Sequence, residues 1–343
     1  MIGYFATGSS KSGGQQVKTC VLADELDKIY GEDQVLKIDT LNWKKRPVRL
    51  FFNLLRIGVT CKNVVMLPAQ NSLPIFTAVL TVLKKITGCK IHYVVIGGWL
   101  AQLLTKRKGL AKKLKKIDGI YVETATMKSA LETQQNFENV FVMPNFKKLT
   151  VLSENELVYP QGAPYKLCTF SRVLKEKGIG DAVKAVTEVN QRLGRDVFSL
   201  DIYGQVDENQ TDWFEALRKT FPDYIRYGGL ISFDRSVETL REYFALLFPT
   251  HFYTEGIPGT IIDAYAAGIP VISAKWESFS DVVEDGKTGI GYDFDNEKQL
   301  ESILFTVAEN PKMLLDMKDN CLSKAKDYVP ETAVRILKIS ERV

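Results

Sequence analysis

The chain has 343 residues, and this length favours two domains over one. Charge is unevenly distributed: residues 1–150 hold 23 basic and 10 acidic side chains, whereas the remainder holds 22 basic and 31 acidic ones. The basic first half predicts an anionic partner. The five cysteines are scattered without a Cys/His cluster, and no run reaches the roughly 18 apolar residues of a membrane span, which excludes a disulfide framework, a zinc site of ordinary spacing and a spanning helix.

Short apolar strands alternate with helical segments along the whole chain, a pattern typical of parallel sheets with helices on both faces. In the first half we expect helices such as 15–30 and 73–87, and strands at 2–5, 35–38, 64–67, 90–96, 119–122 and 140–143. A polar segment flanked by prolines, 145–164, is the expected linker. The second series of strands is expected at 166–171, 197–203, 225–227, 245–248, 270–273 and 289–292.

The predicted fold class is therefore α/β, with two doubly wound Rossmann-like domains that face each other across a cleft. The N-terminal domain is expected at 1–150 and the C-terminal domain at 165–343, with the last helix able to pack back on the N-terminal domain.

A glycine-rich loop follows the first expected strand and precedes a helix. Its Gly13 and Gly14 would let backbone N–H groups approach a phosphate or a sugar hydroxyl, and a flexible turn is the alternative. The loop is not a Walker A motif, because Lys11 precedes the second glycine instead of following it.

Two segments concentrate the basic charge of the first half. The Lys44–Arg56 region mixes cations with large apolar residues, and the Lys106–Lys116 region is basic on most of its surface, with Leu110 and Leu114 as a thin apolar stripe. Such mixtures suit binding to an anionic membrane surface. The alternative is that residues 50–55 pack into the core and the lysines are solvated. No recognition motif supports nucleic acid as a partner.

The most informative stretch runs from residue 246 to residue 286. A strand leads into Glu255 and a glycine-rich loop, and a short helix follows at 260–267 with Asp263 on its first turn. Helix starts at the carboxyl ends of parallel strands favour anions such as a diphosphate. An ordinary capped strand-turn-helix is the alternative.

Two further cations, Arg172 and Lys177, follow the strand expected at 166–171. Arginine offers a planar fork of donors and lysine a point charge, and both suit phosphate oxygens. A surface charge cluster is the alternative, although cations at a helix start oppose the helix dipole unless an anion is bound.

These segments together resemble the "group 1" family of retaining glycosyltransferases, which have the GT-B fold and include enzymes of bacterial polysaccharide and glycolipid synthesis. Its members carry two acids with seven residues between them, here Glu255 and Asp263, then a small-residue helix end and a strand, here 266–272. The family usually has Glu at the second position, so Asp263 is a departure. The resemblance covers about 165–295 and includes the strand-glycine segments 200–204 and 225–230.

The resemblance implies transfer of a sugar from a nucleoside diphosphate, expected to be UDP, to a hydroxyl of a glycan acceptor, expected to be lipid-linked. It makes Arg172, Lys177 and Glu255 the candidate catalytic residues: the cations hold the diphosphate and Glu255 holds the sugar. Donor-binding residues would be Gly256, Ile257, Pro258, Gly259, Thr260, Asp263, Gly204 and Leu230. It implies no metal and no other cofactor, because the cations neutralise the diphosphate.

Several polar residues need a separate interpretation. Many family members have a His where this chain has Gly97 and Gly98, which would let backbone approach the sugar or the acceptor. His92 lies between apolar neighbours and is a predicted core residue, whereas His251 either lines the site or is a surface turn residue. Asp293 and Asp295 resemble a metal-binding pair, but the segment 295–297 reads as the cap and first turn of a helix.

Two alternatives to an active transferase remain open from the sequence: a transferase-like accessory subunit that supports a partner enzyme, and a nucleotide-sugar epimerase on the same fold. The N-terminal segment lacks the basic start and apolar core of a signal peptide, so we expect a cytoplasmic protein attached peripherally to the inner face of a membrane.

Overall fold

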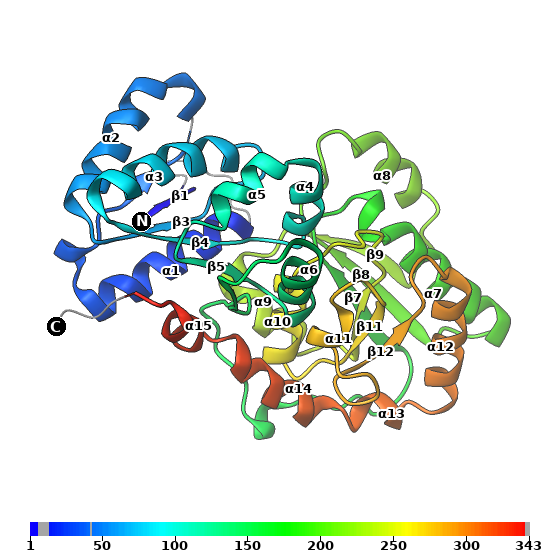
Figure 1. Ribbon diagram of the computed structural model, residues 1–343. Coiled ribbons are helices and arrows are strands. Elements are labelled where there is room, and N and C mark those ends of the chain that lie inside the picture. Colours follow the sequence, from blue (N-terminus) through cyan, green and yellow to red (C-terminus); the bar gives the residue numbers. More distant parts are fainter. Residues whose placement is uncertain (6–13, 42, 340–343) are drawn as a thin grey trace. The chain divides into compact units, whose positions relative to one another are not determined.

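The structure, a computed structural model, describes residues 1–5, 14–41 and 43–339. The chain folds into two units, each with its own core. Unit 1 comprises Met1–Lys148 and Tyr328–Val343, and unit 2 comprises Leu149–Asp327. Each unit contains one six-stranded parallel sheet (Figure 1). The predicted α/β class with two doubly wound units is therefore confirmed.

The sheet of unit 1 has the strand order β2-β1-β3-β4-β5-β6. Its strands are β1 (Ile2–Gly3), β2 (Ile38–Asp39), β3 (Asn63–Met66), β4 (Lys90–Val94), β5 (Gly119–Val122) and β6 (Val140–Val142). The predicted strand at 35–38 is shorter and lies further along the chain, because at this sheet edge only Ile38 and Asp39 pair with β1. The direction of winding reverses between β1 and β3.

Alternate residues of these strands enter two separate cores, as the two-residue period of a strand requires. Val64 and Met66 belong to one core, and Val65 and Leu67 belong to the other. The first core is covered by α2 (Pro47–Thr60), α3 (Leu73–Thr87), α4 (Leu100–Lys106), α5 (Lys108–Leu114) and α6 (Ala125–Gln135). The second is covered by α1 (Gly14–Tyr30) and α15 (Pro330–Ile336), which pack against one another.

The sheet of unit 2 has the order β12-β11-β10-β7-β8-β9. Its strands are β7 (Tyr165–Phe170), β8 (Phe198–Tyr203), β9 (Ile225–Gly229), β10 (Ala245–Phe248), β11 (Val271–Ala274) and β12 (Gly289–Tyr292). On one face α7 (Ile179–Leu193) packs against α12 (Glu297–Glu309), and both contribute to the core with α8 (Thr211–Arg218). Elsewhere α10 (Gly259–Ala266) packs against α9 (Ser236–Leu240) and α14 (Lys318–Ala325). The remaining helices are α11 (Phe279–Val282) and α13 (Lys312–Leu315).

Candidate active site

The candidate site of unit 2 lies where the winding of its sheet changes direction. Strands β7 and β10 are neighbours, yet the chain proceeds from β7 toward β8 and β9 and from β10 toward β11 and β12. Loops leaving such a pair of strands diverge to opposite sides, and ligands of open α/β sheets bind in the crevice between them. The loop after β7 carries Arg172 and Lys177, and the loop after β10 carries Glu255.

Close backbone packing fixes the loop after β7. A short 3-10 turn, Lys175–Lys177, is followed by Gly178 in the left-handed region at φ 68°. A Cβ atom at Gly178 would lie 1.8 Å from the carbonyl oxygen of Pro249, directly after β10. Only glycine permits both this conformation and this approach. The glycine thereby holds the preceding Lys177 against the end of β10.

Lys177 and Glu255 are brought together as an ion pair. Both side chains are less than one fifth exposed, at 18% and 17%. The ammonium nitrogen also lies 5.3 Å and 5.1 Å from the ring centroids of Phe248 and Phe252, within the range of a cation–π contact. Thr250 donates a hydrogen bond of 3.3 Å to the Glu255 carboxylate. Two of the three predicted catalytic residues therefore form a half-buried ion pair with no net charge.

Arg172 is not part of that pair. Its guanidinium binds Asp207, and the arginine side chain is 64% exposed. The Asp207 carboxylate accepts the backbone N–H of Asn209 at 2.9 Å, and this bond, together with Arg172, lowers the pKa of Asp207. Asp207 is not among the residues predicted from the sequence, where its only signal is an acid three residues beyond the strand-end Gly204.

The loop between Glu255 and α10 is buried from Gly256 to Pro258. Helix α10 begins at Gly259 with no side chain capping its first turn. The hydroxyl of Thr260 is buried and has no hydrogen-bond partner among the described residues. A helix start with free N–H groups and an unused hydroxyl suits an anionic ligand. Asp263 follows on the same helix, but its side chain is buried.

The remaining predicted donor residues lie on the β7 side of the sheet. Gly204 directly follows β8 at φ 136°, and a Cβ there would lie 1.8 Å from the carbonyl oxygen of Ser171. This glycine therefore packs directly on the loop that carries Arg172. Leu230 follows β9, the outermost strand, and is 71% exposed. Among the predicted donor residues of this unit, Leu230 follows the strand furthest from the β7–β10 switch point.

The predicted glycines of the first half belong to unit 1. Gly14 begins α1 and is exposed, whereas Gly13 lies outside the described residues. Gly97 follows β4 in the left-handed region at φ 77°, next to the buried Gly98.

A separate hollow of about 430 Å³ lies at the carboxyl ends of β1, β2 and β3, and its lining includes Tyr4, Gln15, Thr40, Lys44 and Ser72.

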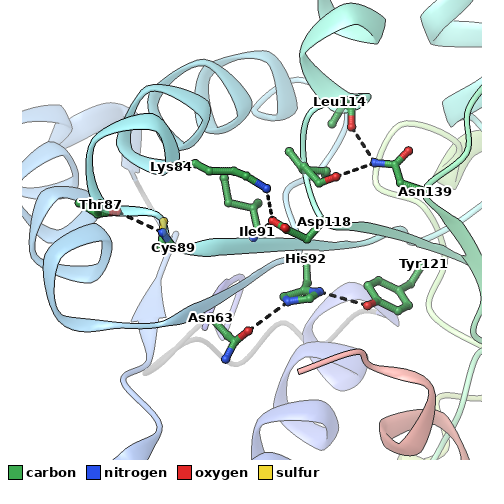
Figure 2. Close-up of polar contacts among 11 residues, drawn as sticks. Asn63, Lys84, Thr87, Cys89, Ile91, His92, Leu114, Asp118, Tyr121 and Asn139 are labelled. Atoms are coloured by element: carbon green, nitrogen blue, oxygen red, sulfur yellow. Dashed lines mark hydrogen bonds and ion pairs between the residues drawn. The ribbon is translucent and has the colours of Figure 1, made fainter. Parts of the chain in front are cut away.

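His92 is a core residue, as predicted. Figure 2 shows its ring between Asn63 and Tyr121, whose side-chain oxygens lie 3.3 Å and 3.1 Å from the two ring nitrogens. Burial lowers the pKa of His92 to about 4, so the ring is neutral at pH 7. A nearby cluster has a structural role of the same kind, because Asp118 binds both Lys84 and the backbone N–H of Ile91.

His251 connects three segments of unit 2. Its Nε2 lies 2.6 Å from Asp181 at the start of α7, and its Nδ1 lies 2.6 Å from Asp295. Burial opposes protonation of His251, but the hydrogen bonds to the two carboxylates and their charges outweigh it and raise its pKa. The capping interpretation of 295–297 is confirmed at Asn296, whose side chain accepts the N–H of Gln299. The Asp295 carboxylate instead contacts the ring of His251.

No cluster of three or more His, Cys, Asp or Glu side chains able to hold a metal occurs in the part of the chain that the structure describes. Within the same part, no helix has the length and apolar character needed to cross a bilayer.

Comparison with known proteins agrees with this geometry. Residues 164–310, which contain all of β7 to β12, match the family model described as "Glycosyl transferases group 1". The alpha-monoglucosyldiacylglycerol synthase of Acholeplasma laidlawii is 29% identical over 162 residues, which are 47% of this chain and 39% of that protein. The chain thus spans about two fifths of the length of the curated relatives it matches.

Solved structures extend the likeness to the whole chain. The Anabaena protein HepE in complex with UDP gives a TM-score of 0.75 at 13% identity, covering 97% of this chain and 96% of that one. Sucrose-phosphate synthase from Thermosynechococcus elongatus also gives 0.75 at 13% identity, covering 97% and 95%. At this identity the likeness shows the fold, which is GT-B. The chain therefore has the GT-B fold, and its residues 164–310 match the model of the group 1 glycosyltransferase family.

Proposed function

We propose that the chain is a retaining, metal-independent glycosyltransferase that moves a sugar from a UDP-sugar to a hydroxyl of a lipid-linked glycan or glycolipid acceptor. The observation that carries this proposal is the half-buried Lys177–Glu255 pair at the β7–β10 switch point, followed along the chain by the uncapped start of α10. Two names among the similar proteins support the chemistry: HepE was solved with UDP and with UDP-glucose, and the Acholeplasma relative is named as a glycolipid synthase.

The donor would bind by replacing one partner of the ion pair. A diphosphate oxygen takes the place of the Glu255 carboxylate on Lys177, and the freed carboxylate accepts hydrogen bonds from sugar hydroxyls. The first-turn N–H groups of α10 and the hydroxyl of Thr260 supply further donors to the diphosphate. Asp263 and Gly204 would hold the nucleoside.

Transfer would then depend on stabilising the leaving diphosphate. The bond between the anomeric carbon and the phosphate oxygen breaks, and a bond to the acceptor oxygen forms on the same face. The acceptor's proton passes to the departing phosphate. Lys177, Arg172 and the start of α10 stabilise the negative charge that develops, and such preorganised groups are worth about 3–4 kcal/mol each in other enzymes.

The acceptor side would belong to unit 1, at the cytoplasmic face of a membrane. The structure corrects one part of that expectation. Leu110 and Leu114, predicted as an apolar stripe beside the lysines of residues 106–116, are buried in the core of unit 1. Residues 106–116 would therefore attract an anionic surface through their positive charge alone.

The test is sugar transfer from a panel of UDP-sugars to a lipid extract, with the anomeric configuration of the product determined by NMR. We expect one UDP-sugar to be consumed with retained configuration, and Lys177→Ala to lower turnover at least tenfold. The matched control is Lys184→Ala, which replaces an exposed lysine on α7 and should leave turnover unchanged. An inverted product would refute the retaining mechanism. UDP-sugar binding without transfer to any acceptor would favour the accessory subunit.

A further inference from the structure

The outer surface of α2 and α3 is apolar where it meets solvent. Seven large side chains on these helices are 45% to 75% exposed, and they make up half of the 14 such exposed side chains in the described residues. Within each helix they recur at spacings that place them on one side. This apolar face consists of Val48, Phe51, Phe52 and Val59 on α2 and Ile75, Val82 and Ile86 on α3.

The apolar face is distinct from the core-facing sides of the same helices. Residues such as Leu54 and Leu80 already fill the core of unit 1. The two helices pack side by side (Figure 1). Gly58 of α2 lies so close to Leu83 of α3 that an added Cβ atom would be 3.0 Å from the leucine side chain. Exposed apolar side chains gathered on two neighbouring helices are typical of a surface that a partner covers.

A basic pocket lies beside that face. A hollow of about 770 Å³ runs between β2 and α2, and its unpaired cations are Lys45, Arg46, Arg49 and Arg56. None of these four has an ion-pair partner among the residues the structure describes. Lys37 also lines the hollow but pairs with Asp27.

The one carboxylate in the lining does not neutralise this pocket. Asp39 accepts the backbone N–H groups of Phe5 and Leu41 at 3.1 Å and 2.9 Å, so one carboxylate faces five cations. Arginine forks in a hollow of this kind suit phosphate oxygens.

We propose that this surface docks on an anionic phospholipid bilayer, with the apolar face in the acyl boundary and the basic pocket on a lipid phosphate. The two features share one helix, because Phe52 lies three residues after Arg49 and four before Arg56, and residues so spaced are neighbours on a helix. A cationic side next to an apolar side is the arrangement of interfacial helices. The lysines of α5, which packs against α3, add long-range attraction.

The position of the pocket also suits a lipid-linked substrate. The basic pocket shares Leu41, Trp43 and Lys45 with the hollow at the carboxyl ends of β1 to β3. A lipid held by its phosphate in the basic pocket presents its headgroup to that second hollow. Docking itself does not rest on the proposed transferase reaction, since it uses no residue of the donor site.

The test is flotation of the full chain with vesicles of phosphatidylcholine, with and without about one third phosphatidylglycerol, in the absence of nucleotide-sugar. We expect binding to the anionic vesicles only. The pocket variant Lys45→Gln/Arg49→Gln/Arg56→Gln should bind about 100-fold more weakly, since each cation near an anionic surface contributes about a factor of five. The face variant Phe52→Ser/Val59→Ser/Ile86→Ser should lose binding even at low salt.

A charge-matched control is available on the other side of the sheet. Lys28→Gln/Arg335→Gln/Lys338→Gln also removes three exposed cations, from α1 and the α15 region, and should weaken binding less than about threefold. If the pocket and control variants lost vesicle binding equally, diffuse positive charge would account for the binding and the assignment to the basic pocket would be overturned. Binding of glycerol 3-phosphate or single-stranded RNA, lost in the pocket variant and accompanied by no vesicle binding, would overturn the lipid assignment. Because no sugar donor is present, a failure of sugar transfer leaves the vesicle result standing.

Discussion

The substitution Gly178→Ala tests whether close packing of the β7 loop on β10 holds the site together. The added Cβ would lie 1.8 Å from the Pro249 carbonyl oxygen, whereas a Cβ atom in a folded protein essentially never approaches another atom closer than 3.0 Å, so the backbone must move by more than an ångström. Overpacking of that kind costs about 1–3 kcal/mol. Holding alanine at φ 68° adds roughly 1–2 kcal/mol. We therefore expect a loss of about 2–5 kcal/mol.

The matched control lies two residues away. A Cβ at Gly180 would have no atom within 4 Å, and this residue has ordinary helical backbone within α7. Gly180→Ala should therefore be neutral or stabilise the protein by up to about 1 kcal/mol.

Thermal unfolding of both variants distinguishes the two outcomes. For a unit of this size, the expected loss in Gly178→Ala corresponds to a fall of roughly 5–15 °C in Tm. UDP binding should weaken as well, because the shift carries Lys177 away from the end of β10, where the diphosphate is proposed to bind. Should Gly178→Ala unfold within a degree or two of Gly180→Ala, the packing argument for this loop would be refuted.

Three further predictions concern charges in unit 2. Lys318 is buried without a hydrogen-bond partner, and burial lowers its pKa to about 8, so Lys318→Met should stabilise the protein by about 1–3 kcal/mol at pH 7. That gain, measured by urea unfolding, should shrink as the pH rises from 8 toward 10.5, because the folded protein then holds the lysine neutral and removing its proton costs less as the pH nears the unfolded pKa; a pH-independent gain would contradict it. His251 has a raised pKa in the folded state, so its contribution to stability is complete below its unfolded pKa and is lost as the pH rises through the folded value. Asp295→Asn should therefore destabilise the protein more at pH 6 than at pH 8, and equal losses at the two pH values would rule out a protonated His251. Glu255→Gln should abolish sugar transfer while UDP affinity measured by calorimetry is retained, since the proposed partner of Glu255 is the sugar; full activity would exclude its catalytic role.

The sheets could be predicted well from the sequence because each strand is a short apolar run between turn residues. The limits of β5, β10 and β12 were predicted to the residue. Gly204 was identifiable because a strand followed by glycine indicates backbone that another residue would block.

The parts that escaped prediction depend on contacts between distant segments. Nothing near Arg172 in the sequence indicates that its partner is Asp207, 35 residues away. The carboxylates on His251 come from α7 and from the turn before α12, so only the folded sheet brings them together. The apolar face is a similar case. Phe52 and Leu54 are both apolar in the sequence, and only the direction in which each side chain leaves the folded helix makes Phe52 exposed and Leu54 buried.

The most direct test of the proposed donor site is calorimetric titration of UDP into the parent chain, Lys177→Ala and Lys184→Ala. We predict that Lys177→Ala weakens UDP binding at least tenfold, because a charge-assisted bond to phosphate contributes about 1.5–3 kcal/mol. Lys184→Ala should bind UDP as the parent does. Equal UDP affinity in all three proteins would contradict a donor site at the β7–β10 switch point.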